Sequence, residues 1–313
     1  MKYYEVDFVI EPVGQTAREL LAAVAGEAGF ETFEDTDAGV KGYVQQQVFD
    51  ESTLRLAIDD FPMPGVSVSF SVAESEDRDW NEQWEQQGFE PILVKGGSLV
   101  KGKMLPRIVI HDGRHFPAEL SENNPKSSSE PSSPLIPIEI DAHQAFGTGT
   151  HETTRMVCST LIDIVNLIPK TSTLKSLDCG TGTGILSICA LKLGVAEAVG
   201  YDIDDWSVDN ARHNAVINQV DERFTPLLGD SSILNKVEGV FDIVMANINR
   251  NILIQDMPQF RQKMAPGAWL ILSGFYIEDV PLLTARASEL GLGLVGQCEE
   301  GGWACMALKE FEV

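Results

Sequence analysis

The chain has 313 residues, of which 43% are hydrophobic and 22% charged, and its formal net charge at pH 7 is −24. This length favours two domains over one, and the composition is that of an ordinary globular protein. The acidic excess argues against direct nucleic-acid binding as the main activity, because that binding needs Lys and Arg to neutralise phosphates. It is compatible with a basic protein partner, or simply with solubility or salt adaptation.

The cysteines and the N-terminus indicate a cytoplasmic protein in a reducing compartment. The number of cysteines is odd, at five, and no two are spaced as CxxC. We therefore expect neither a disulfide framework nor a metal site. The N-terminus lacks the apolar core of a signal peptide, and no apolar run approaches the length of a membrane span, so no membrane partner is expected.

Strand patterns and helix patterns alternate over residues 1–75, which predicts a small α+β domain of the ferredoxin-like kind. A further strand is possible near Glu31. The strand patterns lie at 3–10, 39–48 and 66–72, and the helix patterns at 16–28 and 51–58.

A polar helix is predicted to follow at 77–87, with Trp80 and Trp84 on one face because they are four residues apart. These tryptophans either pack the helix onto a neighbouring domain or form a hinge or partner surface. We take residues 76–100 as a linker helix with its connection, and residues 101–313 as the second domain.

Residues 121–134 are rich in Ser, Pro and Asn, a composition typical of a mobile loop or linker. They lie between two strand patterns, at 107–111 and 136–141. We interpret the segment as an insertion at the tip of a hairpin and not as a domain boundary.

From residue 151 onward, helices and strands alternate regularly, which predicts a doubly wound parallel sheet resembling the seven-stranded sheet of class I methyltransferases. The Gly301-Gly302 turn before the last strand gives that strand an antiparallel partner. Helices are predicted at 153–165, 185–193, 207–218, 252–264 and 280–290, and strands at 174–177, 198–201, 224–228, 241–245, 268–272, 292–296 and 303–308.

The turn after the first of these strands, residues 178–184 (DCGTGTG), indicates the ligand. A strand, a glycine turn and a helix form a nucleotide-type binding loop. A dinucleotide loop reads GxGxxG, but here the third glycine comes one residue early and Ile185 stands in its place. Asp178 would repel a pyrophosphate and suits an ammonium group. The loop therefore disfavours an oxidoreductase and predicts S-adenosylmethionine at Asp178, Gly180 and Gly182.

Two other strand ends carry carboxylates. Asp202 follows the second strand and can accept from both ribose hydroxyls of an adenosine. Its alternative role is a helix N-cap, for which Asp204 and Asp205 are better placed. Asp230 follows the third strand and either accepts from the adenine amino group or is a turn residue.

Asn247 follows the fourth strand, in residues 245–248 (MANI). A neutral amine that attacks a sulfonium methyl must be oriented, and a side-chain carbonyl can accept its protons. Asn suits this role because it carries no charge that would hold the amine as an ammonium. We therefore predict Asn247 as the catalytic residue, although a plain strand-end turn is the alternative.

Residues 145–154 (AFGTGTHETT) precede the first sheet strand and open a helix. One interpretation is a helix start capped by Thr150 or Thr153. The other is a glycine-flexible lid that packs Phe146 over a flat ligand. His151 is either a base or a packed histidine.

The segments AFGTGTHETT, SLDCGTGTGILSICALKLG, YDID and ANI together strongly resemble the PrmA family, which methylates the eleventh protein of the large ribosomal subunit. The resemblance covers essentially the whole chain and includes the DRDWNEQW linker helix. It departs from the family at 141–144 and at Asp205-Trp206, where the family commonly has proline.

The resemblance implies an S-adenosylmethionine-dependent protein N-methyltransferase, and we expect a monomer. Phe146, Gly147 and Thr148 match the loop that closes on the cofactor. The N-terminal domain resembles a substrate-recognition domain, and the products implied are trimethylated lysines and a trimethylated N-terminal α-amine of a basic ribosomal protein. The positions that match cofactor contacts in the family are Thr154, Gly180, Asp202 and Asn247.

Two other functions stay open at this point. Glutamine methyltransferases of release factors favour Asn-Pro-Pro-Tyr, whereas residues 247–250 read NINR, which argues against that substrate. A non-catalytic S-adenosylmethionine-binding or ribosome-assembly module is the alternative from another class. The expected reaction is an in-line displacement without a metal or a covalent enzyme intermediate.

Overall fold

The computed structural model describes residues 3–46, 48–59, 61–63, 65–74, 88–97, 99–100, 104–115, 133–142, 147–168 and 171–310. It divides into two compact units, Met1–Glu82 and Gln83–Val313, which are described separately. Phe146, the helix predicted at 77–87 and residues 121–132 of the Ser-rich segment lie outside the described residues. No helix in the described ranges is long and apolar enough to cross a membrane.

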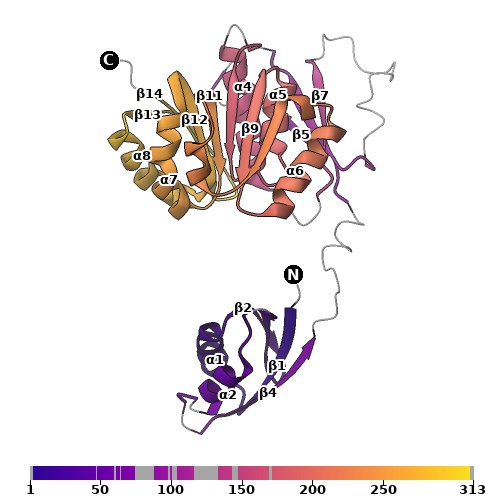
Figure 1. Ribbon diagram of the computed structural model, residues 1–313, viewed down its shortest axis with the longest axis vertical. Coiled ribbons are helices and arrows are strands. Elements are labelled where there is room, and N and C mark those ends of the chain that lie inside the picture. Colours follow the sequence, from indigo (N-terminus) through magenta and orange to yellow (C-terminus); the bar gives the residue numbers. More distant parts are fainter. Residues whose placement is uncertain are drawn as a thin grey trace. The chain divides into compact units, whose positions relative to one another are not determined.

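The N-terminal unit has the ferredoxin-like arrangement that its sequence predicts. Its four strands lie in the order β2-β3-β1-β4, every neighbouring pair is antiparallel, and two helices complete the unit (Figure 1). Val6, Phe8 and Ile10 alternate along the first strand and are buried in the core. The elements are β1 (Tyr3–Glu11), α1 (Gln15–Glu27), β2 (Phe30–Thr36), β3 (Gly39–Gln45), α2 (Glu51–Asp59) and β4 (Ser67–Glu74).

The C-terminal unit contains a seven-stranded sheet in the order β10-β9-β8-β11-β12-β14-β13 (Figure 1). All strands are parallel except β14, which runs antiparallel to β12 and β13. The predicted class I fold is thereby confirmed. The strands are β8 (Lys175–Cys179), β9 (Glu197–Asp202), β10 (Phe224–Leu228), β11 (Phe241–Asn247), β12 (Met264–Tyr276), β13 (Leu292–Glu300) and β14 (Trp303–Glu310).

Both faces of this sheet are buried. Ile243 and Met245 of β11 belong to one apolar core, which the helices α4, α5 and α6 share, whereas Val244 and Ala246 belong to the other, shared by α7 and α8. Strands buried on both faces read as continuous apolar runs, which is why they could be located in the sequence. The helices are α4 (Glu152–Leu167), α5 (Ile185–Lys192), α6 (Asp205–Ile217), α7 (Arg250–Lys263) and α8 (Val280–Glu289).

A three-stranded sheet made of β5 (Ile92–Lys95), β6 (Arg107–His111) and β7 (Leu135–Glu139) precedes the large sheet in the chain. Its β6 and β7 are parallel, and β5 is the antiparallel neighbour of β6. The predicted hairpin between β6 and β7 is therefore wrong. An alternating pattern reveals that a strand exists but not its direction.

The backbone after β5 is attached to the C-terminal unit by a buried carboxylate. Asp163 of α4 is fully buried and accepts hydrogen bonds from the backbone N–H groups of Gly97 and Leu99, at 2.7 and 2.6 Å. Hydrogen bonds to both oxygens satisfy this buried charge. They attach Gly97 and Leu99 to the helix that begins at the candidate site.

Candidate active site

Three neighbouring strands bring the predicted site residues to one edge of the sheet. β8 lies between β9 and β11, and all three are parallel. In this register Cys179 pairs with Tyr201 on one side and with Ala246 on the other. Gly180, Asp202 and Asn247 follow directly, so they lie at adjacent positions at the carboxyl edge, where doubly wound sheets bind ligands.

The glycine loop packs closely against its neighbours. Gly180 has φ +76°, and a Cβ there would lie 2.4 Å from the Ile248 side chain. The loop therefore requires glycine both for its conformation and for its contact with the segment that follows Asn247. The Gly182 N–H, within the same loop, donates to Asp202 Oδ2 at 2.9 Å.

Asp178 is completely buried beneath the loop. Its Oδ2 accepts from Thr181 Oγ1 at 2.8 Å and from the Ser187 backbone N–H and hydroxyl at 3.2 and 3.0 Å. Its Oδ1 is buried and has no partner within the described parts of the chain. Burial raises the pKa of the carboxyl to about 7, although these hydrogen bonds lower it. A cation at Oδ1 would favour the charged form.

Asp202 is half-buried and is not the cap of the following helix. That cap is Asp204, whose side chain accepts from the Trp206 N–H. Asp202 accepts one backbone N–H on each oxygen, from Gly182 and from Asp204. A carboxylate oxygen has a second lone pair, so both oxygens keep an acceptor site for a diol.

Asp230 is the N-cap of a short 3-10 helix, η3 (Ser231–Asn235), and accepts from the Ser232 N–H at 2.9 Å. This contact confirms the interpretation of Asp230 as a turn residue. It does not assign a ligand role to the side chain.

The segment before α4 is attached to the glycine loop. Thr183 Oγ1 donates to the Gly147 carbonyl at 2.7 Å, and the hydroxyls of Thr148 and Thr150 are 2.7 Å apart. Gly147 has φ +113°, and a Cβ there would approach the Thr183 hydroxyl to 2.9 Å. The conformation and this contact both require glycine at position 147.

His151 is the N-cap of α4, so the predicted Thr150 or Thr153 cap is wrong. The Thr153 backbone N–H donates to His151 Nδ1 at 3.2 Å, and the Thr153 hydroxyl lies 2.8 Å from the same nitrogen. The imidazole accepts because its ring reaches the first helical turn. Nδ1 is thereby engaged by the first turn of the helix.

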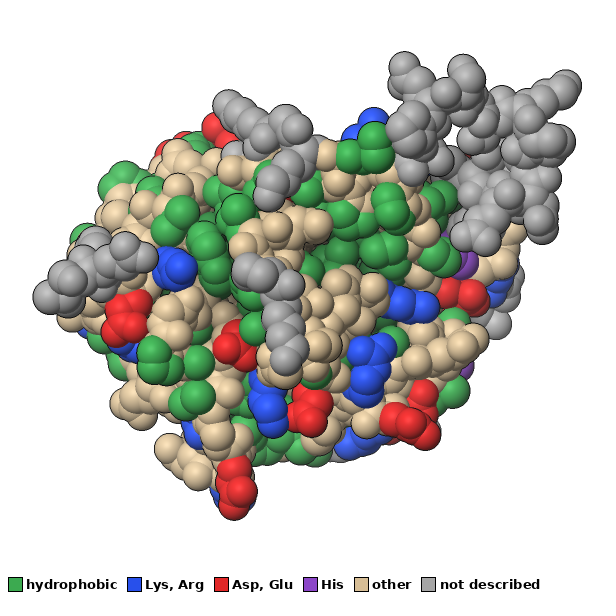
Figure 2. All heavy atoms as spheres, turned by 90° about the horizontal axis from the view of Figure 1, so that it is seen from above, with side chains coloured by type: hydrophobic (Ala, Val, Ile, Leu, Met, Phe, Trp, Pro, Cys, Tyr) green, Lys and Arg blue, Asp and Glu red, His purple; other side chains and the backbone are tan. Residues whose placement is uncertain are grey.

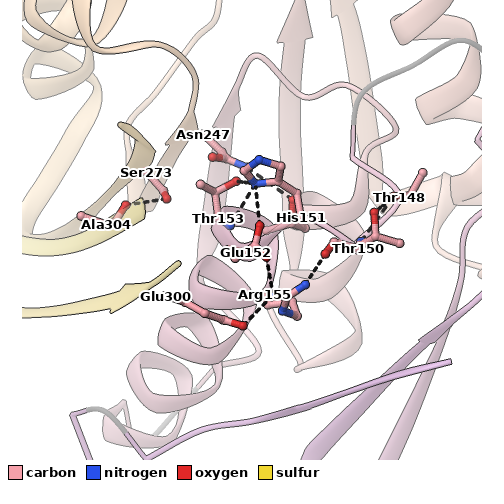
Figure 3. Close-up of polar contacts among 11 residues, drawn as sticks. Thr148, Thr150, His151, Glu152, Thr153, Arg155, Asn247, Ser273, Glu300 and Ala304 are labelled. Carbon is pink, nitrogen blue, oxygen red and sulfur yellow. Dashed lines mark hydrogen bonds and ion pairs between the residues drawn. The ribbon is translucent and has the colours of Figure 1, made fainter. Parts of the chain in front are cut away.

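Arg155 braces the same segment. Its guanidinium donates to the Thr150 carbonyl, to Glu152 at 3.1 Å and to Glu300 of β13 at 2.5 Å, and Figure 3 shows these contacts on both sides of the side chain. Arg155 and Thr183 were not among the predicted site residues. Neither stands in a local motif that signals its distant partner.

Asn247 carries the second unpartnered acceptor at this edge. Its Nδ2 lies 3.5 Å from Thr154 Oγ1 of α4, and Thr154 is itself fully buried. Its Oδ1 is buried without a partner in the described ranges. Figure 3 shows Asn247 at the start of α4. The Nδ2 atom of the amide thus contacts Thr154, and its Oδ1 atom is left to accept a hydrogen bond.

These groups fit S-adenosylmethionine better than a dinucleotide. The edge offers two unpartnered acceptors, Asp178 Oδ1 and Asn247 Oδ1, and the loop 178–184 contains no basic residue. Buried acceptors on the protein need a ligand that supplies N–H donors or a cation. A pyrophosphate is itself an acceptor and needs donors on the protein. A methionine ammonium and a substrate amine supply the required chemistry.

Comparisons with known proteins agree with this geometry. The family model of the ribosomal protein L11 methyltransferases (PrmA) matches residues 117–310. Curated L11 methyltransferases from Bacteroides thetaiotaomicron and Phocaeicola vulgatus are 39% and 37% identical, each over 98% of this chain and over 99% and 98% of the relative. The crystal structure of the L11 methylase from Lactobacillus delbrueckii subsp. bulgaricus matches with TM-score 0.52 and 25% identity, over 70% of this chain and 99% of that chain. The chain therefore belongs to the ribosomal protein L11 methyltransferase family and is an S-adenosylmethionine-dependent methyltransferase of class I fold.

Proposed function

We propose that this protein transfers methyl groups from S-adenosylmethionine to lysine ε-amines and to the N-terminal α-amine of ribosomal protein L11. The observation that carries the proposal is Asn247 Oδ1, a buried acceptor without a partner among the described residues. Relatives named L11 methyltransferase, which align over nearly the full chain, support L11 as the substrate.

Asn247 orients the attacking amine. Bound S-adenosylmethionine supplies an electrophilic sulfonium methyl group. The Asn247 Oδ1 accepts an N–H of the neutral amine, and the contact between Nδ2 and Thr154 keeps the amide from turning. Because the amide is uncharged, it does not favour the ammonium form, and burial of the amine lowers its pKa further.

The amine proton leaves to water in this proposal. His151 Nδ1 accepts from the first turn of α4, so the imidazole serves as a cap. Catalysis then rests on orientation of the amine and its removal from bulk water.

The remaining sequence-predicted residues keep their proposed roles at the cofactor. Asp178 faces the methionine ammonium with Oδ1, and Asp202 accepts from the ribose hydroxyls. Residues 1–75 bind the substrate protein, and residues 76–100 link them to the enzyme domain. The other proposed cofactor contacts are Phe146, Gly147, Thr148, Thr154, Gly180, Gly182 and Asn247.

The test is methyl transfer to purified, unmethylated L11, followed by intact-mass analysis. We expect additions of single methyl masses with the unaltered protein and a loss of about a hundredfold in kcat for Asn247→Ala, in the range of removing one orienting or polar contact from an active site. Asn251→Ala is the matched control, because Asn251 is exposed at the start of α7.

Two results would contradict this proposal. Turnover of Asn247→Ala at the rate of the unaltered protein would remove Asn247 from the mechanism. Binding of S-adenosylmethionine and L11 without any mass increase would favour a non-catalytic assembly module.

A further inference from the structure

Three aromatic rings contact one another in a row, which we call the aromatic wall. Tyr276 lies at the end of β12, Trp303 at the start of β14, and His151 is the N-cap of α4. The Tyr276 and Trp303 rings stack with centroids 4.3 Å apart and planes at 27°. The His151 ring meets Trp303 edge to face, at 4.9 Å and 70°. Tyr276 and Trp303 are partners in the strand register, and the Ile277 N–H donates to the Gly302 carbonyl at 2.9 Å. The backbone therefore places Tyr276 and Trp303 side by side.

This aromatic wall (His151, Tyr276, Trp303) is connected to the proposed amine site through the start of α4. The first turn of α4 contacts both: Thr154 contacts Asn247, and His151, the cap of the same turn, contacts Trp303. In the sheet, Asn247 pairs with Ser273 of β12, three residues before Tyr276. Tyr276 is 51% exposed, so the wall is open to solvent at this ring.

Successive methylation changes what can hold the substrate amine. A neutral primary amine has two N–H groups, a monomethyl amine has one, and a dimethyl amine has none. Asn247 Oδ1 can accept from the first two but has nothing to accept from the third. The third transfer needs a contact that recognises methyl groups or an alkylated cation, and aromatic faces provide that contact.

We propose that the aromatic wall binds the N-methylated intermediates of the substrate amine and so permits the third methyl transfer. This inference rests on the proposed function. The dimethylammonium loses its proton to water, and its nitrogen lone pair forms the new N–C bond. The C–S bond of the sulfonium breaks with its electron pair staying on sulfur, which gives a trimethylammonium group and S-adenosylhomocysteine.

The experiment compares L11 in two forms, unmethylated and reductively dimethylated at its amines, so that only the third transfer remains in the second form. Trp303→Leu and Tyr276→Leu remove rings, whereas Trp303→Phe and Tyr276→Phe keep them. On dimethylated L11 we expect the leucine variants to lose about tenfold in kcat/KM, the size of a partly desolvated cation–π contact. On unmethylated L11, the first transfer changes by less than about threefold, and the phenylalanine variants stay near the unaltered protein on both forms.

Thermal unfolding and S-adenosylhomocysteine binding show whether each variant is folded. Because Tyr276 is half exposed, its leucine variant tests the inference even where Trp303→Leu unfolds. If the unaltered protein adds no methyl group to L11, the proposed function fails and the inference with it. If it trimethylates L11 and folded leucine variants do so with the same ratio of third to first transfer, the inference alone is overturned.

Discussion

At the scale of single residues, the site is built on buried acceptors that are left without protein partners. Asp178 lies one residue before the end of β8, and Asn247 is the last residue of the neighbouring β11. The Oδ1 atom of each is unsatisfied within the described residues. Such atoms cost free energy in the absence of a ligand. In the proposed function, groups of the cofactor and of the substrate amine donate to them.

Asp178→Asn should make the ligand-free protein more stable at alkaline pH. The folded-state pKa of Asp178 is raised to about 7 from 3.8, so the native state holds this proton while the unfolded chain releases it. The stability that the protonated carboxyl contributes is complete below pH 3.8 and is lost as the pH rises towards 7. Each unit of pKa shift corresponds to about 1.4 kcal/mol.

The expected result is an unfolding midpoint of Asp178→Asn that exceeds that of the unaltered protein by several degrees at pH 8, with the difference vanishing near pH 4. The same variant should bind S-adenosylhomocysteine at least about tenfold more weakly, because a charge-assisted contact to the ammonium is lost. Thermal scans at several pH values and calorimetric titration measure both effects. If the two proteins unfold at the same midpoint at pH 8, ionisation of the Asp178 carboxyl does not destabilise the ligand-free protein, which contradicts the prediction.

At the scale of elements, the sequence was informative wherever the pattern was local. β8, the glycine turn and α5 could be located because an apolar run, three glycines and a helical period follow one another. The β6–β7 hairpin was predicted wrongly because strand direction depends on partners outside the segment. The cap of α4 was missed because His151, unlike Thr150, is not a common capping residue.

Arg155 shows why part of the site could not be predicted. Its partner Glu300 lies 145 positions away in the chain, and neither residue stands in a motif. The same is true of Tyr276 and Trp303, which meet only through the register of β12 and β14. Sequence patterns located the glycine loop at residues 178–184. The aromatic wall and the contacts of Arg155 depend instead on elements that are far apart in the sequence.

Arg155→Met should weaken cofactor binding more than it weakens the fold. The side chain connects Thr150, Glu152 and Glu300 around the segment that precedes α4, and partly exposed ion pairs contribute only about 1 kcal/mol or less. We expect the dissociation constant for S-adenosylhomocysteine to rise about three- to tenfold as the segment loses its brace. The unfolding midpoint should fall by no more than a few degrees.

Arg212→Met is the matched control, because Arg212 is exposed and pairs with Asp209 on α6. Calorimetric titration and thermal scans on both variants separate binding from stability. If Arg155→Met loses stability but binds S-adenosylhomocysteine as tightly as the unaltered protein, Arg155 stabilises the fold and does not contribute to cofactor binding.

At the scale of the whole molecule, charge is the property most directly tied to the proposed partner. The chain has 47 acidic and 23 basic residues. On the face drawn in Figure 2, acidic and basic side chains are interspersed among hydrophobic ones, without a patch of one sign among the residues described there. The summed field of this acidic excess attracts a basic protein.

The association of this protein with L11 should accordingly depend on ionic strength. Between about 0.05 M and about 0.5 M salt the Debye length falls severalfold, and we expect kcat/KM for L11 to fall about tenfold, because steering raises association rates by that order or more. Once the complex is formed, the amine and the methyl group meet in a buried site, so kcat should change by less than about twofold. Initial rates at low and saturating L11 measure the two quantities, and the dissociation constant of S-adenosylhomocysteine over the same salt range is the control. A kcat/KM that does not respond to salt would mean that apolar contacts, and not charge, bring the two proteins together.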